Sequence, residues 1–242
     1  MVRFSNRRSN TTPAAGADRR RQRADRRRVE ILRAAARVFR TRGFAAAGMR
    51  EIAVAAELSP ANLYHYFRGK DELLYFCQNR SLDRLLAALA DARAATGPLD
   101  RRLRALAVAH VRCLLDEVEG SAAHFEVDAL PPKLRAAIVA KRDRYERGIR
   151  AIVARGIRAG SLAPGDPTVV TRAFLGALNW TARWFNPDGP YSPDQIASLV
   201  GDYAAGGLVY ARYQTRAHRP DRQPRTRRGR VRAVQNAARG AA

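Results

Sequence analysis

The chain has 242 residues, of which 46% are apolar and 28% are charged, and its formal net charge is +23. It contains no apolar run long enough to cross a membrane, no apolar segment behind the basic residues at its N-terminus, and only two cysteines. This balance excludes a membrane-spanning or disulfide-rich secreted protein and predicts a globular protein of a reducing cytoplasm.

Most of the excess positive charge lies at the two ends of the chain. Residues 1–28 hold ten arginines and two aspartates, and residues 214–242 hold nine arginines and one aspartate, a net charge of +8 at each end. Both ends are poor in large apolar residues, so they cannot offset the entropy of ordering themselves. We therefore predict a disordered basic arm over 1–26 and a disordered basic tail over 214–242. These ends are either solvated extensions or segments that lie along a DNA backbone and add non-specific affinity.

The helical pattern of the chain begins near residue 27. Ile31, Ala35 and Phe39 recur at helical spacing, and Gly43 is typical of a left-handed helix end. These residues predict the first helix of the body over 27–43.

Residues 44–73 predict two short helices, over about 49–56 and 60–66, and the start of a longer one. Ser59 can cap the free N–H groups of the second short helix, and Pro60 suits its first position. A helix this short with a polar first turn is typical of the recognition helix that a helix-turn-helix protein lays in the DNA major groove. The stretch therefore predicts a sequence-specific DNA-binding protein.

The polar residues of this region suit two kinds of DNA contact. The amide of Asn62 can pair with both N6 and N7 of adenine. The hydroxyls of Tyr64 and Tyr66 and the ammonium of Lys70 suit phosphates, which position a protein on DNA. One of the two tyrosines is alternatively a core residue, because residues two apart face different sides of a helix.

Helical patterns continue through the rest of the body. We predict helices over about 70–95, 99–117, 131–159, 167–185 and 193–213, with irregular structure or one short helix over 118–130. No strand-like alternation or internal repeat is present. The prediction is an all-α protein of about nine helices, with a helix-turn-helix domain over 27–69 and a second helical domain over 70–213.

The predicted helix over 167–185 is apolar nearly all round, so it must be covered on both sides. Trp180 and Trp184 lie four residues apart on one face, with Arg183 beside them. They are either an aromatic pair in the core or the wall of a pocket, in which the arginine faces an anionic ligand. Together with the last helix, which carries the small residues 204–207, this helix is a plausible dimer surface. Two-fold symmetry would extend DNA recognition to a palindrome.

Over residues 27–75 the chain resembles the TetR family of transcriptional regulators. The resemblance rests on Phe39 and Gly43–Phe44, on Arg50–Glu51–Ile52–Ala53, on Leu63–Tyr64–His65–Tyr66–Phe67, and on Lys70 with Leu73–Leu74. It implies a three-helix DNA-binding head, a linking helix, and a helical ligand-binding core whose last two helices pair with those of a partner subunit.

The resemblance also implies roles for single residues. Tyr64, Tyr66 and Lys70 occupy positions that contact phosphates, and Phe67 occupies that of a buried aromatic. The first short helix opens on Gly48, where the family usually has threonine, and Arg50 is the residue expected to compensate. With the family's base-reading positions included, the predicted DNA-binding residues are Arg50, Pro60, Ala61, Asn62, Tyr64, His65, Tyr66 and Lys70.

A second resemblance concerns the run ALNWTARWFNPDGPYSPDQIA and the following Gly207–Leu208. It is similar to TetR regulators of fatty-acid and steroid breakdown, which respond to acyl-coenzyme A thioesters, so the implied effector is an acyl-CoA. The predicted ligand-binding residues are Phe174, Asn179, Trp180, Arg183 and Trp184. The predicted dimerisation residues are Leu199, Tyr203, Gly207 and Tyr210.

Two other classes of protein were weighed. His110, Cys113 and Asp116 share a helical face that suits a metal or redox site, but a partly buried core face explains them as well, and nothing else indicates an enzyme, a cofactor or a metal. A non-specific architectural protein driven by its arginine-rich ends is the alternative to a sequence-specific regulator. The expected function is that of a bacterial, nucleoid-associated transcriptional repressor. It would bind a palindromic operator as a homodimer and be released by a small-molecule effector.

Overall fold

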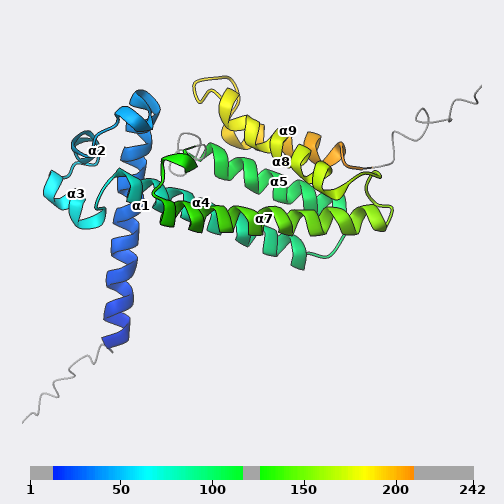
Figure 1. Ribbon diagram of the computed structural model, residues 1–242, viewed down its shortest axis with the longest axis horizontal. Helices are drawn as coiled ribbons and strands as arrows, with labels where there is room; N and C mark the ends of the chain where they lie inside the picture. Colours follow the sequence, from blue (N-terminus) through cyan, green and yellow to red (C-terminus); the bar gives the residue numbers. More distant parts are fainter. Residues whose placement is uncertain (1–12, 117–125, 210–242) are drawn as a thin grey trace, which may run out of the picture. The chain divides into compact units, whose positions relative to one another are not determined.

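The computed structural model describes residues 13–116 and 126–209, and Figure 1 shows its helices. Within these ranges the chain forms eight α-helices and one short 3-10 helix, and no strand. The all-α prediction is therefore confirmed. The predicted basic tail, the end of the second helical domain beyond residue 209 and the stretch 117–125 lie outside the described residues.

Helix α1 (Pro13–Ala46) begins much earlier than residue 27 and is interrupted at Gly43, whose φ of 75° and ψ of 158° are not helical. The predicted disordered arm is thus wrong for residues 13–26, which are helical, whereas residues 1–12 lie outside the described part. Alanine and arginine make up most of this segment. Both are strong helix formers, so the segment adopts a helix although it has no apolar face to bury.

The head of the protein consists of α1, α2 (Met49–Ala55) and α3 (Pro60–Tyr66), as predicted. Between the two short helices the chain turns at Glu57, which has a positive φ of 54°. A small core holds the three helices together because each of them supplies buried apolar side chains. These are Ile31, Ala35 and Phe39 from α1, Ile52 and Ala53 from α2, and Leu63 from α3.

Helix α4 (Lys70–Ala94) continues from the head into the second domain. Its acidic first turn, Asp71 and Glu72, suits the positive end of the helix dipole. The buried leucines along its length belong to the same continuous core as the head and the body. Helix α4 therefore connects the head to the body through a shared core.

The body consists of α4, α5 (Leu99–Leu115), η1 (Val127–Ala129), α7 (Pro132–Arg158), α8 (Pro167–Trp184) and α9 (Pro193–Gly206). Helix α5 packs against α4, α8 and α9, and α7 packs against α4 and α8. Figure 1 shows α5, α7, α8 and α9 running alongside one another. The last helix was predicted to end near 213, but it ends at Gly206, where a turn follows.

The contact between α5 and α9 is close because α9 presents a glycine. A Cβ atom on Gly201 would lie 2.6 Å from Cγ2 of Val108. On the same side, the guanidinium of Arg104 binds the carboxylate of Asp202, and the guanidinium Nε of Arg112 donates to Asp194 at 2.7 Å. One side of α9 is thus held against α5, and its other side faces outward.

Candidate DNA-binding surface and effector region

The first turn of α3 is capped as the sequence predicts. The hydroxyl of Ser59 accepts a hydrogen bond from the backbone N–H of Asn62 at 3.2 Å, and Pro60 takes the first helical position. On the inner side Leu63 and Phe67 are buried, and they anchor the helix to the head. The structure brings five of the predicted DNA-binding residues together on the exposed side of α3: Pro60, Ala61, Asn62, Tyr64 and His65.

The two tyrosines of α3 differ in exposure. Tyr64 is 50% exposed, whereas Tyr66 is half-buried and packs against the core of the head. The ring of Tyr66 also stands edge-on to that of His65, with 5.5 Å between the ring centroids. Tyr64 therefore presents its hydroxyl at the surface, and Tyr66 contributes to the packing of α3.

Arg28 was not among the residues identified from the sequence, although it positions α3. Its guanidinium carbon lies 5.5 Å from the ring centroids of both Phe67 and Phe76, and Nη2 donates to the carbonyl of Tyr66 at 3.4 Å. A cation over two aromatic faces and a helix-terminal carbonyl is a favourable arrangement. The sequence shows an arginine on the first helix, but nothing near it in the sequence indicates that it contacts the rings of Phe67 and Phe76.

Lys70 joins the start of α4 to the end of α1. Its ammonium donates to the carbonyl of Phe44 at 3.2 Å and to that of Ala45 at 2.8 Å, and it lies 5.0 Å from the ring centroid of Phe44. Two of the three N–H donors of the ammonium are thus used within the protein. The role of Lys70 in holding the head together was not predicted.

The start of α2 is capped without a side-chain hydroxyl, because the cap residue is Gly48. The carboxylate of Glu51 accepts a hydrogen bond from the backbone N–H of Gly48 at 3.2 Å, and Arg42 lies 3.2 Å from the other oxygen of that carboxylate. A glutamate at the third helical position is a known signal for such a cap, and it was overlooked. Arg50 is exposed and takes no part in the cap.

Three polar side chains meet in the apolar interior of the body. His110 on α5 is 2% exposed. Its Nδ1 lies 3.0 Å from the hydroxyl of Tyr145 on α7, and its Nε2 lies 3.0 Å from Oδ1 of Asn179 on α8. Because an amide oxygen only accepts, Nε2 carries the proton and Nδ1 accepts from the tyrosine. We call these three residues the polar triad.

Burial sets the protonation of the polar triad. It lowers the pKa of His110 from 6.5 to about 4, against the opposing effect of the hydrogen bond to Asn179. Burial likewise raises the pKa of Tyr145 far above its usual range. At neutral pH the triad is therefore uncharged, and it links three helices through directional bonds.

The predicted ligand-binding residues do not lie together. Phe174 is buried and Asn179 is half-buried in the triad, whereas Trp180 is 65% exposed, Trp184 is 50% exposed and Arg183 is also on the surface. This exposure contradicts the interpretation of the tryptophans as an aromatic pair in the core, whereas their role in a ligand site with Arg183 stays a prediction. The buried residues of α8, which packs against α5, α7 and α9, are Thr171, Phe174, Leu178 and Thr181, and the two tryptophans are not among them.

Several large apolar side chains of α8, α9 and the loop between them are exposed. They are Val169, Trp180 and Trp184 of α8, Tyr191 of the following loop, and Leu199 and Tyr203 of α9. Gly207 is also exposed, just after the end of α9. Of the predicted dimerisation residues, Leu199, Tyr203 and Gly207 thus lie at the surface, and Tyr210 lies outside the described residues. We call this surface the outer α8–α9 face.

The three residues weighed as a metal or redox site have other partners. His110 belongs to the polar triad, the thiol of Cys113 lies 3.0 Å from the hydroxyl of Ser81, and Asp116 accepts from Arg84 at 2.9 Å. In the described part of the chain no cluster of three metal-ligating side chains is found. Among the same residues, no helix combines the length and the apolar character that a membrane span requires.

Two family models match the chain. Residues 31–75 match bacterial regulatory proteins of the tetR family, and residues 96–208 match a tetracyclin repressor-like C-terminal domain. The first match covers the head, and the second covers the body from just before α5 to just after α9.

Individual proteins match over most of their length. The transcriptional activator FasR of Mycolicibacterium smegmatis is 29% identical over 199 residues, which are 81% of this chain and 90% of FasR. The crystal structure of the TetR-family regulator PfmR from Thermus thermophilus is 34% identical, with a TM-score of 0.66 over 74% of this chain and 99% of PfmR. AibR in complex with isovaleryl coenzyme A and operator DNA is 28% identical, with a TM-score of 0.61 over 76% of this chain and 98% of AibR.

Proposed function

Because this chain belongs to the TetR family of bacterial transcriptional regulators, which respond to ligands, we propose that it binds a palindromic operator as a homodimer and releases it when an acyl-CoA binds the body. The observation that carries the DNA-binding part is the capped helix α3, whose inner side is buried and whose exposed side presents Asn62, Tyr64 and His65. We place the regulator in the cytoplasm, in contact with the nucleoid.

Base reading is assigned to the first turn of α3. The exposed amide of Asn62 suits a bidentate contact with adenine. The exposed hydroxyl of Tyr64 and the guanidinium of Arg50 suit phosphates. Tyr66 is half-buried, so we expect it to contribute less than Tyr64 to phosphate binding. Lys70 uses two of its N–H donors within the protein and has one left for a phosphate.

The effector is assigned to the interior of the body, near the polar triad. Phe174 is buried on the inward side of α8, and the triad supplies polar groups within apolar surroundings. Apolar walls with a few placed polar groups are typical of small-molecule sites. A related protein, AibR, has been solved in complex with isovaleryl coenzyme A and operator DNA, which supports an acyl-CoA as a ligand of the body.

Helix α4 is the element that couples the two events. It begins at Lys70, which binds the end of α1, and its other end packs against α5 and α7. An effector that binds one arrangement of the body better shifts the equilibrium between arrangements. To lower operator affinity about 100-fold, it needs a differential affinity of about 2.7 kcal/mol.

Selection of DNA from a random pool tests the proposal. We expect an enriched palindrome, and we expect acyl-CoA esters to lower binding to that palindrome in a gel shift. A pool that stays random would support the alternative of a non-specific architectural protein. An unchanged gel shift across a panel of acyl-CoA esters would exclude this class of effector, but it would not contradict binding to the operator. Transcription from a reporter with and without the effector distinguishes a repressor, our expectation, from an activator such as FasR.

We assign the interface of the homodimer to the outer α8–α9 face. We expect Trp180→Glu to raise the dimer dissociation constant at least about 100-fold, because the change buries a charge twice in a two-fold symmetric interface. Sedimentation equilibrium measures the effect. Val139→Glu is the matched control, since Val139 is a partly exposed valine of α7, outside this face. A wild-type monomer, or equal dimerisation of Trp180→Glu and wild type, would contradict the assignment.

A further inference from the structure

Arg28 lies where α1, the end of α3 and α4 meet. Phe67, at the end of α3, and Phe76, on α4, form an edge-to-face pair with 5.5 Å between their ring centroids. The guanidinium carbon of Arg28 lies 5.5 Å from the centroid of each ring, and its Nη2 donates to the carbonyl of Tyr66. One side chain of α1 thus contacts the recognition helix and the linking helix at once.

The backbone that joins these two helices is extended. Helix α3 ends at Tyr66 and α4 begins at Lys70, with Phe67 at φ −143° and ψ 123° and Gly69 at φ −178° and ψ 175°. Each residue of such a connection has two soft dihedral angles, and rotation about them changes the direction of the attached helix. The orientation of α3 against α4 therefore depends on side-chain contacts.

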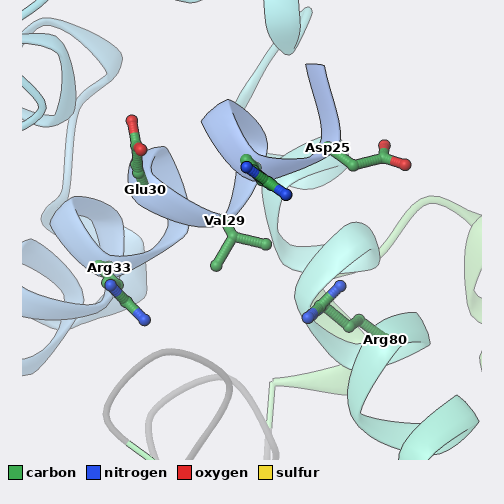
Figure 2. Close-up of a pocket in the computed structure, with 6 residues that line it drawn as sticks. Asp25, Val29, Glu30, Arg33 and Arg80 are labelled. Atoms are coloured by element: carbon green, nitrogen blue, oxygen red, sulfur yellow. The ribbon is translucent and has the colours of Figure 1, made fainter. Parts of the chain in front are cut away.

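Helix α4 continues alongside α1 beyond Phe76. Arg80 is four residues further on and lies on the same side of α4, where it lines a pocket with Val29 and Arg33 of α1. Figure 2 shows Val29 between Arg33 and Arg80. Arg28, the neighbour of Val29 in the sequence, is therefore part of a longer contact between the two helices.

We propose that Arg28 is a positioning residue that fixes the end of the recognition helix against the linking helix, so that operator affinity depends on Phe76 through Arg28. The proposal rests on the operator binding proposed above. A guanidinium is planar, so its face can stack on a ring while its edge donates to a carbonyl. A displacement of Phe76 changes the contacts of Arg28, and with them the support of the last turn of α3. In this way α4 influences the DNA-binding surface through a side chain of α1.

The expected effect of breaking this link is weaker operator binding by a protein that is still folded. A protein whose binding-competent arrangement is only partly populated loses affinity in proportion to that fraction, and a homodimer uses two heads. Arg28→Met keeps an unbranched side chain but removes the cation and its N–H donors. Phe76→Leu keeps an apolar residue but removes the ring that Arg28 contacts.

A double-mutant cycle on operator affinity tests the link between these two residues. We expect Arg28→Met and Phe76→Leu each to bind the selected operator at least about fivefold more weakly than wild type. The double variant should bind within about twofold of the weaker single variant, because both changes remove one shared contact.

Arg27→Met is the matched control for the loss of charge. It removes the same charge from the adjacent position of α1, where Arg27 pairs with Glu30 at the surface. We expect it to lower operator affinity by less than about twofold, since an exposed ion pair contributes little. Its effect should multiply with that of Phe76→Leu, because Arg27 takes no part in the shared contact.

Hydrogen–deuterium exchange without DNA separates this test from operator recognition. We expect the amides of residues 63–67 to exchange at least about fivefold faster in Arg28→Met and in Phe76→Leu than in Arg27→Met, because the last turn of α3 opens more often. Circular dichroism confirms that the variants remain folded. If Arg28→Met does not fold, Arg28→Lys, which keeps the charge but not the planar fork, replaces it in both measurements.

Three results would overturn the proposal. The first is exchange over residues 63–67 that is the same in Arg28→Met as in wild type. The second is a double variant in which the losses of the two single variants simply multiply, and the third is an equal loss of affinity in Arg27→Met. A random pool without an enriched palindrome would count against the proposed function alone, and the exchange measurement would still decide whether Arg28 holds α3.

Discussion

Asn62→Ala is expected to lower the affinity for the selected operator between about 30-fold and 10⁴-fold. A bidentate contact between an amide and adenine discriminates by about 1–3 kcal/mol, and a homodimer loses the contact in both half-sites. The variant should fold normally, because the cap of α3 uses the backbone N–H of residue 62 and not its side chain. Quantitative gel shifts at fixed salt measure the loss.

The matched control is Asn79→Ala. Asn79 lies on α4, where its amide donates only to the exposed Asp83 at 3.3 Å, so its removal should leave the operator affinity unchanged. Asn62 is neutral, and the dependence of binding on salt concentration should stay as in wild type. An equal loss of affinity for random DNA would refute the assignment of Asn62 to base reading.

Acidification from pH 6.5 to about 4 is expected to cost roughly 3 kcal/mol of folding stability through His110 alone. The folded protein keeps this buried imidazole neutral until about pH 4, whereas the unfolded chain takes up the proton near pH 6.5. The unfolded state thus binds more protons throughout this window. The stability is fully present above pH 6.5 and is lost progressively as the pH falls to about 4.

Denaturant titrations of His110→Gln and wild type at several pH values isolate this contribution. The variant should be less stable at pH 7, because the triad is disturbed, but its stability should fall less steeply below pH 6.5. His65→Gln is the control, since it removes an exposed imidazole of α3 that lies outside the polar triad. Parallel curves for His110→Gln and wild type would show that His110 is not the titrating group.

The local features of the head were predictable because their signals lie close together in the sequence. Ser59 and Pro60 mark the start of α3 within two residues, and the structure confirms both roles. The extension of α1 to Pro13 was missed because the prediction followed the apolar face. A helix rich in alanine and arginine needs no such face to form.

Contacts between distant helices were not predictable in the same way. His110 and Tyr145 each stand on the apolar side of a helix, but no spacing rule connects residues of α5 and α7. The positions of Trp180 and Trp184 were mistaken for a related reason. The sequence of α8 is apolar nearly all round, and only the packing of its neighbours decides which side faces inward.

The bond of Lys70 to the carbonyls of Phe44 and Ala45 has a mechanical consequence. An ammonium group rotates freely about its last carbon–nitrogen bond and binds each oxygen as a point charge, without the fixed plane of a guanidinium. Two bonds of this kind tolerate a small change in direction better than a bidentate guanidinium pair does. With α4 about 37 Å long, a tilt of about 5° at its start displaces its far end by about 3 Å.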